Sequence, residues 1–403
     1  MNILFVNNTA GYFGGVEQYI DLAAKALRGR GHQVSLAYGN EGRDTKAYLE
    51  TFAARYRCKE MMAKGGNGRP IDGILEYRNP DVVFVHKAPD AVLLSEKLRR
   101  FPTAVMVHDH DYCCPRRHKY HALTGKVCNR PAGFRCYLDC AFVRRDPAAG
   151  LGIGFQSIRR KMAVMKRLWE LGCMVVGSRY MQEELEMNGC PADRIALVPP
   201  AFTRPFPDPV PLPQEPNILY VGQLIRGKGV DQLLRALGLL ETDFRCRIVG
   251  DGNHRGKLET LCRKLGLEDR ISFEGWVAPH QVHEMYAWAR VSVVPSRWPE
   301  PFGMVGLEAM HHARPVVGFD VGGISDWLVN GSTGLCVPAG NVAAFAEAVK
   351  KVLADFSLAE SMSSEGYSHV KNEYVFDKLI GQLEGVLSGV SRTRNKKAGA
   401  LCR

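Results

Sequence analysis

Short apolar runs alternate with stretches of helical periodicity along the whole chain, which predicts βαβ units and parallel sheets. In the first half, strands are expected at 2–8, 32–38, 81–87, 103–109, 173–178 and 195–200. In the second half, they are expected at 218–224, 245–251, 271–276, 291–296, 315–320 and 334–338. The expected fold class is therefore α/β, with two Rossmann-like, doubly wound domains facing across a cleft, where the carboxyl ends of open sheets bind ligands.

A proline-rich segment separates the two sets of strands. Eight of the eighteen residues of 199–216 are Pro, which excludes helix and sheet and favours a stiff linker. The linker divides an N-terminal domain, 1–198, from a C-terminal domain, 217–371. An amphipathic helix is predicted at 372–391 and is expected to pack back on the N-terminal domain. The polar, basic residues 392–403 are predicted to form a mobile tail.

Composition and charge limit the class of protein and the kinds of partner that we expect. The chain is 46% hydrophobic and 24% charged, as globular enzymes are. It has no apolar run of about 18 residues and no basic leader, so a cytoplasmic protein is expected. The net charge of +11 divides into +10 for residues 1–200 and +1 for residues 201–403. The first half is therefore expected to meet an anionic partner, such as a phosphorylated substrate or the anionic inner face of a membrane, and not nucleic acid, whose binding signatures are absent.

The segment VSVVPSRWPEPFGMVGLEAMHHARPVVGFD predicts a strand, a loop, a helix and a second strand. The residues from Phe302 to Met304 lie where the helix is expected to begin, so their N–H groups can face an anion. Glu300 precedes this turn, and the side chain of Glu308 tilts back towards it. Both carboxylates can therefore accept hydrogen bonds from hydroxyls of one sugar-like ligand. The alternative is that both are ordinary solvated charges.

Two Gly-containing loops provide further candidate sites. In VGQLIRGKGVDQLL, Arg226 and Lys228 flank a loop that opens a helix, where a phosphate would be held, unless both are simply solvated. In NNTAGYFGG, Gly14 and Gly15 leave the backbone open to a ligand, and Glu17 follows in the first turn of a helix.

Cysteines cluster at 113–140, after the strand predicted at 103–109. Five of them fall within 28 residues, and the reducing cytosol favours metal over disulfide. A structural zinc is expected, with reduced thiols in a packed loop as the alternative. The expected ligands are Cys114, Cys128, Cys136 and Cys140, for which Cys113, His110, His118 or His121 could substitute.

Taken together, these motifs resemble a retaining glycosyltransferase of the GT-B fold, glycosyltransferase family 4, over almost the whole chain. EPFGMVGLE carries the family's two Glu, GGVE its first loop, VHD its acceptor-side His, and VGQLIRGKGVDQLL its phosphate loop. VGDG, FEGWV and GGISDWLVNGSTGLCVP match its base-side strands and late strand region. The resemblance implies transfer of a hexose-type sugar from a UDP- or GDP-sugar to a saccharide or lipid-linked acceptor. The product would belong to surface polysaccharide, lipopolysaccharide or glycolipid synthesis.

The resemblance also implies roles for single residues. Glu308 should bind the ribose hydroxyls, Glu300 the donor sugar, Arg226 and Lys228 the diphosphate, and His108 the sugar or the reacting centre. The implied catalytic set is His108, Glu300, Arg226 and Lys228. The other donor-binding positions are Gly14, Gly15, Gly222, Gly250, Trp276, Val277, Phe302, Gly303, Met304 and Val305. The acceptor side would include Glu17, His108 and Asp109.

One position departs from the family pattern. The family usually has Arg after the Gly of the phosphate loop, whereas Gln223 follows Gly222 here. We expect Arg226, in the same loop, to replace that cation. Asp109 and Asp111 also match the Asp-x-Asp metal motif of GT-A enzymes. The two-Rossmann layout argues against that fold, and cations at the diphosphate make a divalent metal redundant.

Three questions stay open at this point. A nucleotide-sugar epimerase or a phosphorylase would share the fold, and a non-catalytic nucleotide-sugar-binding scaffold is the alternative from another class.

The segment 155–169 has apolar residues at helical spacing with five cationic residues close by. It is either a membrane-surface helix or a helix that packs its apolar stripe into the first domain.

Overall fold

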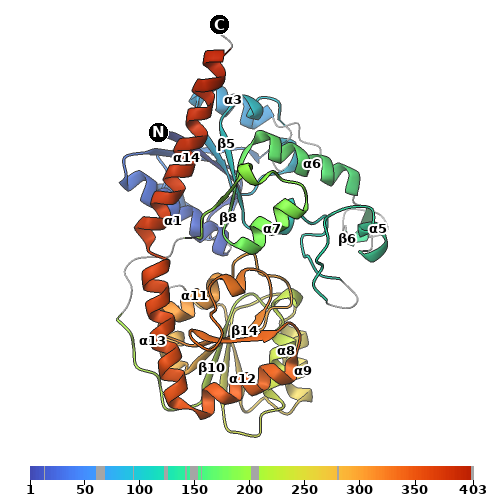
Figure 1. Cartoon of the computed structure of the whole chain (residues 1–403), viewed down its shortest axis with the longest axis vertical. Coiled ribbons are helices and arrows are strands. Elements are labelled where there is room, and N and C mark those ends of the chain that lie inside the picture. The colour runs from blue at the N-terminus through green and yellow to red at the C-terminus, as the bar shows by residue number, and fades with distance from the viewer. Residues whose placement is uncertain are drawn as a thin grey trace. The chain divides into compact units, whose positions relative to one another are not determined.

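The computed structural model describes residues 1–12, 14–59, 69–93, 95–121, 126–140, 143–145, 153–155, 157–200, 208–278 and 281–400. The chain forms two compact units, whose helices and strands are labelled in Figure 1. Unit 1 consists of Met1–Arg117, Arg130–Thr203 and Phe376–Arg403, and unit 2 of His118–Asn129 and Arg204–Val375. Residues 201–207 of the expected linker, 122–125 of the cysteine loop and 401–403 of the tail lie outside the described residues.

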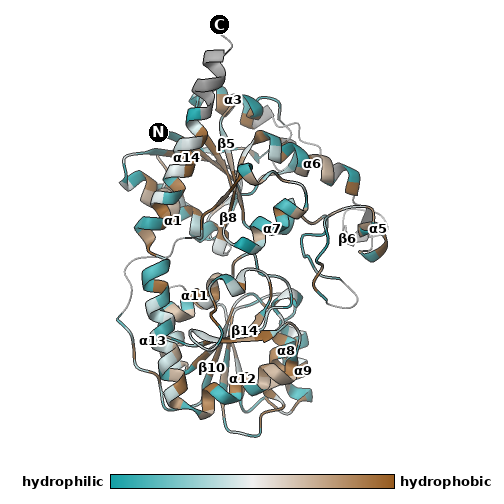
Figure 2. Ribbon diagram, viewed as in Figure 1, coloured by the Kyte–Doolittle hydropathy of each residue, from teal (hydrophilic) through white to brown (hydrophobic). Residues whose placement is uncertain are grey.

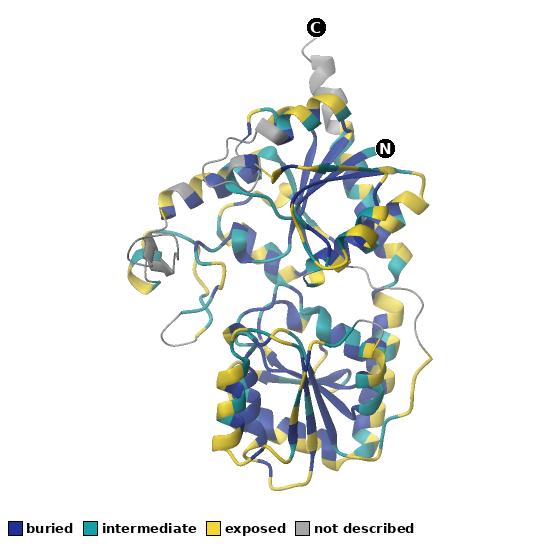
Figure 3. Ribbon diagram, turned by 180° about the vertical axis from the view of Figure 1, so that it is seen from behind, coloured by how far each residue is buried: buried dark blue, intermediate teal, exposed yellow. Residues whose placement is uncertain are grey.

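Unit 1 is built on a parallel sheet of order β3-β2-β1-β4-β5-β8-β9. Its strands are β1 (Asn2–Ala10), β2 (Gln33–Glu41), β3 (Ala54–Arg57), β4 (Val82–Val85), β5 (Thr103–Val107), β8 (Gly172–Val176) and β9 (Ile195–Leu197). Its helices are α1 (Gly15–Gly29), α2 (Thr45–Glu50), α3 (Arg69–Arg78), α4 (Asp90–Leu93), α5 (Cys136–Asp139), α6 (Ile158–Leu171), α7 (Arg179–Met187) and α14 (Phe376–Ala400). A separate antiparallel hairpin pairs β6 (Val143–Arg145) with β7 (Ile153–Phe155). The central strands are buried on both faces (Figure 3), as their continuous apolar runs require.

Unit 2 is built on a second parallel sheet, of order β12-β11-β10-β13-β14-β15. Its strands are β10 (Asn217–Val221), β11 (Arg245–Val249), β12 (Ile271–Gly275), β13 (Val291–Val294), β14 (Val316–Asp320) and β15 (Gly334–Pro338). Its helices are α8 (Val230–Leu237), α9 (Arg255–Lys264), α10 (Val282–Trp288), α11 (Met304–His311), α12 (Val342–Ala354) and α13 (Phe356–Glu373). Hydrophobic residues concentrate in the strands of both sheets (Figure 2). The α/β, two-domain GT-B fold expected from the sequence is confirmed.

The strand order reverses once in each sheet, between β1 and β4 in unit 1 and between β10 and β13 in unit 2. In open parallel sheets, the loops that leave the carboxyl ends of the strands diverge at such a point, and ligands bind in the space between them. The loops after β10 and β13, and those after β1, β4 and β5, therefore come first in the search for a site.

The basic segment 155–169 packs into unit 1. Phe155 ends β7, and α6 begins later, at Ile158. Val164 and Leu168 of α6 are fully buried in the core of unit 1. The helix therefore packs its apolar stripe into unit 1, which is the second of the two alternatives. Among its described large apolar side chains, only Met162 is notably exposed. Within the described residues, we find no helix with the length and apolarity that a membrane crossing demands.

The C-terminal residues differ from the expected helix and mobile tail. The stretch predicted at 372–391 is divided, because α13 ends at Glu373 in unit 2 and α14 begins at Phe376 in unit 1. The helix α14 then continues to Ala400, through most of the segment expected to be a tail.

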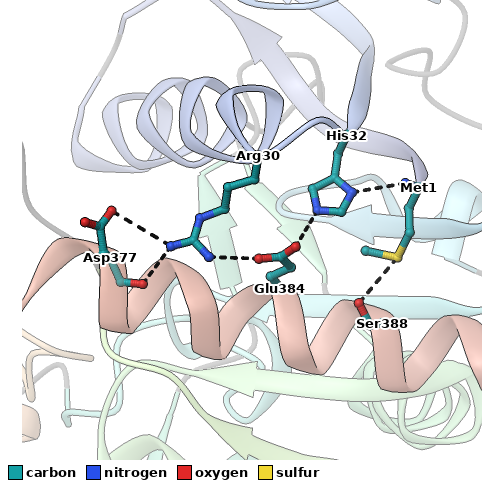
Figure 4. Close-up of polar contacts among 6 residues, drawn as sticks. All are labelled: Met1, Arg30, His32, Asp377, Glu384 and Ser388. Atoms are coloured by element: carbon teal, nitrogen blue, oxygen red, sulfur yellow. Dashed lines mark hydrogen bonds and ion pairs between the residues drawn. The ribbon is translucent and has the colours of Figure 1, made fainter.

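A polar network joins α14 to the start of the chain in unit 1 (Figure 4). Glu384 accepts hydrogen bonds from Arg30 at 2.9 Å and lies 2.7 Å from Nε2 of His32. The amino group of Met1 lies 3.0 Å from Nδ1 of His32, and Arg30 also donates to the backbone oxygen of Asp377. The pKa of Glu384 is held below its ordinary value by the hydrogen bonds from His32 and Arg30.

Candidate functional site

In unit 2, backbone hydrogen bonds join the loops that follow β10 and β13. The N–H groups of Arg297 and Trp298 both donate to the carbonyl of Gly227, at 2.9 and 3.1 Å. Gly229 has φ +68°, and a Cβ there would lie 1.8 Å from the carbonyl oxygen of Pro295. Only glycine fits this close crossing, which brings the loop carrying Lys228 against the loop that leads to Glu300.

Lys228 and Glu300 form an ion pair at this junction. The ammonium of Lys228 lies 2.8 and 3.0 Å from the two carboxylate oxygens of Glu300. Glu300 is only 4% exposed, and it also accepts a hydrogen bond from Ser296. Lys228 lies 5.6 Å from the ring centroid of Trp298, within reach of a cation–π interaction. Glu300 is therefore a fixed, buried carboxylate and not the solvated charge of the alternative reading.

Two other residues of the predicted phosphate loop, Arg226 and Gln223, do not join this pair. Arg226 and Gln223 are exposed on the loop after β10. The short 3₁₀ turn Arg226–Lys228 lies between that strand and α8. The structure thus places a half-buried, paired cation at Lys228 and leaves the guanidinium of Arg226 at the surface.

The helix after Glu300 begins without a side-chain cap. Gly303, at φ +91°, is the N-cap, and α11 starts at Met304, followed by Val305. Phe302 is buried, and its carbonyl accepts a hydrogen bond from Nε1 of Trp327 at 2.6 Å. N–H groups at an uncapped helix N-terminus attract anions, and this one lies four residues along the chain from Glu300.

Glu308, in the same helix, has a strongly perturbed environment. Burial raises its pKa to about 7, although a hydrogen bond with the hydroxyl of Tyr286 opposes that rise. The ring of His312 stacks on Tyr286 with centroids 4.7 Å apart. A carboxylate that titrates near neutral pH gains much from any ligand hydroxyl that donates to its charged form.

The remaining donor-side residues line the ends of β10, β11 and β12. A Cβ on Gly250 would lie 1.9 Å from the carbonyl oxygen of Gly222, so these loops touch through backbone. Trp276 is 59% exposed directly after β12, and Val277 is half-buried. The contact explains the need for glycine at Gly250, whereas a Cβ on Gly222 would lie 2.8 Å from the hydroxyl oxygen of Tyr220.

In unit 1, the first loop is organised by Glu17. Its carboxylate accepts a hydrogen bond from the N–H of Gly14, the N-cap of α1, at 3.1 Å, and Gly15 begins the helix. Glu17 is 8% exposed, and burial raises its pKa. This bond is the half of a capping box that the Glu supplies, a structural role that the sequence prediction did not consider.

Four side chains meet where β4 and β5 end in unit 1. Nδ1 of His86 lies 3.0 Å from Nε2 of His108, and Lys87 pairs with Asp109. Burial would raise the pKa of Asp109, but the ammonium of Lys87 outweighs it and holds that pKa low. Asp111 is 3.0 Å from Arg117. Sequence reasoning missed His86 and Lys87, although both end a predicted strand of the same sheet.

The predicted zinc site finds no support in the part of the chain that the structure describes. Cys114, Cys128, Cys136 and Cys140 all lie in it, and no three His, Cys, Asp or Glu side chains there are placed to hold a metal ion. Local backbone bonds organise these turns instead. The N–H of Cys114 donates to His110, and that of Cys128 to Lys119, each at 2.8 Å.

Known proteins share this organisation. The family described as Glycosyl transferases group 1 matches residues 206–369, and Glycosyltransferase Family 4 matches residues 13–143. Alpha-D-kanosaminyltransferase of Streptomyces kanamyceticus is 33% identical over 178 residues, which are 43% of this chain and 46% of the relative. D-inositol 3-phosphate glycosyltransferase of Nocardia farcinica is 28% identical over 276 residues, 63% of this chain and 61% of the relative. The alignments thus span less than two thirds of these relatives.

Among solved structures, HepE of Anabaena in complex with UDP and glucose superposes with a TM-score of 0.71. The two are 18% identical in sequence, and the match covers 96% of this chain and 99% of HepE. At this level of identity, the likeness establishes the fold.

Proposed function

Since the chain belongs to the GT-B glycosyltransferases of family 4, we propose that it transfers a sugar from a nucleotide diphosphate donor to an acceptor in glycan or glycolipid synthesis. The observation that carries the proposal is the pair of the half-buried Lys228 with the buried Glu300 at the topological switch point of unit 2, beside the uncapped N-terminus of α11. A cation, a carboxylate and free N–H groups at one strand edge suit a diphosphate joined to a polyhydroxyl group.

In the proposed site, Lys228 binds the diphosphate with the first N–H groups of α11. An ammonium has three donors, so Lys228 can bind phosphate oxygens while it keeps a bond to Glu300. Arg226, exposed on the same loop, adds the cation that Gln223 does not supply. When the bond from the anomeric carbon to the phosphate breaks, negative charge grows on the leaving diphosphate. These groups are already in place to stabilise that charge, so no divalent metal is needed.

The carboxylates hold the two ends of the donor. Glu300, fixed by Lys228 and Ser296, accepts hydrogen bonds from hydroxyls of the transferred sugar. Glu308 accepts from the ribose, and Trp276 and Val277 lie on the side of the base. HepE was solved with UDP and glucose, which supports a UDP-sugar as the first donor to test, with GDP-sugars second.

Unit 1 supplies the acceptor side in this proposal. The family resemblance assigns His108 to the sugar or the reacting centre, and Glu17 and Asp109 to the acceptor side. The surplus of +10 charges in residues 1–200 favours an anionic acceptor, either a phosphate-bearing saccharide or a lipid-linked one at an anionic membrane surface. The family resemblance favours retention of the anomeric configuration.

The test is a transfer assay with UDP-glucose, UDP-galactose, UDP-N-acetylglucosamine and GDP-mannose, read by nucleoside diphosphate release and by NMR of the product. Lys228→Ala should lower turnover by about 10²-fold, as loss of a contact to developing charge does. Lys350→Ala, on the exposed face of α12, is the matched control and should not change turnover. A Lys228→Ala variant as active as the control would exclude the proposed diphosphate site. An inverted product would correct the stereochemistry alone.

A further inference from the structure

His86 and His108 end neighbouring strands of the sheet in unit 1. Strands β4 and β5 pair in parallel, with Val85 opposite Val105, so the two histidines follow at adjacent strand ends. The backbone N–H of His86 donates to the carbonyl of Val6 at 2.9 Å, which fixes its position. The two rings lie within 27° of parallel, and Nδ1 of His86 is 3.0 Å from Nε2 of His108.

Both rings are neutral at pH 7. His86 is fully buried among the rings of Phe5, Phe84 and Tyr19. Burial lowers its pKa well below the ordinary value, and His108 lowers it further. Burial also lowers the pKa of His108 to about 3, with a further decrease from the charge of Lys87. Each ring therefore carries one N–H, and a single proton lies in the bond between them.

The surroundings of His86 indicate which ring donates that proton. Its other nitrogen, Nε2, is buried and has no hydrogen-bond partner within the described residues. If His108 donated, this nitrogen would be a buried N–H without an acceptor. If His86 donates, it is only an unused lone pair. Orphaned buried N–H groups are rarer in native proteins than under-satisfied acceptors, so the second arrangement is favoured.

We infer that His86 is a positioning residue: it donates Nδ1–H to Nε2 of His108 and thereby holds His108 in the Nδ1–H tautomer. The nitrogen of His108 outside this bond is then a hydrogen-bond donor towards a ligand oxygen. The hydrogen bond made by one ring nitrogen sets the protonation of the other. This inference rests on the proposed function for the identity of the ligand, a sugar or acceptor oxygen. In this tautomer, His108 offers that ligand a neutral hydrogen-bond donor and does not serve as a base.

The direct test is the tautomer of His108 in the wild-type chain. Protein labelled with ¹⁵N-histidine is examined by two-bond ¹H–¹⁵N correlation spectra at pH 7, and the His108 signals are assigned by their loss in His108→Gln. We expect a protonated Nδ1 and an unprotonated Nε2. A proton on Nε2, or a doubly protonated ring, would overturn the inference. The spectrum requires no substrate, so it decides the inference even if no nucleotide sugar is turned over, a result that would instead refute the proposed function.

Two variants of equal size, His86→Asn and His86→Asp, then keep and reverse the direction of the hydrogen bond. In His86→Asn, the amide can still donate near the Nδ1 position, so the Nδ1–H tautomer and transfer should be retained within a few-fold. In His86→Asp, the ionised carboxylate can only accept, so the proton of His108 should move to Nε2 and transfer should fall by tenfold or more. Affinity for UDP or GDP, whose proposed site is in unit 2, should stay the same in both. Equal losses of transfer in the two variants, or a parallel loss of nucleotide affinity, would show a merely structural role. If the Asp variant does not fold, the wild-type and Asn spectra still decide.

Discussion

Ionisation of Glu308 should make nucleotide-sugar binding depend on pH. Burial raises the pKa of this carboxyl to about 7 in the free protein. Ribose hydroxyls donate to the ionised form, so a bound donor requires the proton to leave. Affinity should therefore rise with pH up to neutrality and be constant above it.

The pKa sets the size of the effect. At pH 6 the carboxyl is about one-tenth ionised, so affinity should be about tenfold weaker than at pH 8, and about 100-fold weaker at pH 5. Each pH unit below 7 corresponds to about 1.4 kcal/mol of binding free energy. Glu308→Gln should lose about 1.5–3 kcal/mol at pH 8, since a charge-assisted bond becomes a neutral one. Its affinity should then be nearly independent of pH.

Isothermal titration calorimetry with UDP-glucose or GDP-mannose between pH 5 and 8 measures this directly. A nucleotide sugar is the right probe, because its terminal phosphate is esterified. The terminal phosphate of a free nucleotide has its own pKa near 6 and would titrate in the same range. His254, His311 and His312 are present in both proteins, so any effect of these histidines cancels. The difference between the wild-type and Glu308→Gln pH profiles therefore isolates Glu308. If wild type and Glu308→Gln have the same slope, the ribose role of Glu308 is refuted.

Three further outcomes follow from the same account. Arg226→Ala should lower turnover by about 10²-fold if this exposed cation replaces the one missing at Gln223. Gln223→Arg should be neutral or activating. If Gln223→Arg raised steady-state turnover by several orders of magnitude, the replacement would be contradicted. Glu384→Gln should lower the free energy of unfolding by about 1 kcal/mol at pH 7 in urea titrations, relative to the Glu360→Gln control on α13. Because the folded-state pKa of Glu384 is lowered, this difference should be present at neutral pH and vanish as the pH falls through the acid range, and a difference that persists in acid would contradict it. In flotation at low salt, anionic liposomes should recover more protein than neutral ones, and equal recovery would leave a soluble acceptor.

The sequence predicts the two sheets well because their central strands are continuous apolar runs. Both Val82–Val85 and Val291–Val294 are buried on both faces; the first is wholly apolar, and the second is interrupted only by Ser292. The edge strand Ala54–Arg57 was missed because alternate residues are exposed and two of its four are Arg. The long C-terminal helix was underestimated because its last residues are polar and basic, a composition shared by tails and solvated helices.

The residues that we propose to bind the donor could be selected from the sequence, and their partners in the fold could not. Glu300, Lys228 and Glu308 stand in local motifs, whereas Ser296, Tyr286 and His86 carry no motif. Their importance arises from contacts between segments that only the folded chain brings together. The cysteine loop stays a prediction, because spacing along the chain cannot tell whether thiols converge in space.

A thermal-shift measurement of the full chain with nucleotide sugars tests the central claim most directly. A donor at 100 times its dissociation constant should stabilise the protein by about 2.7 kcal/mol. For a unit of this size, that corresponds to a rise in Tm of roughly 5–10 °C. The account predicts this rise for at least one UDP- or GDP-sugar, with its loss in Lys228→Ala and its retention in Lys350→Ala. A chain whose Tm no nucleotide sugar raises, or whose Lys228→Ala variant is stabilised as much as the wild type, would contradict it.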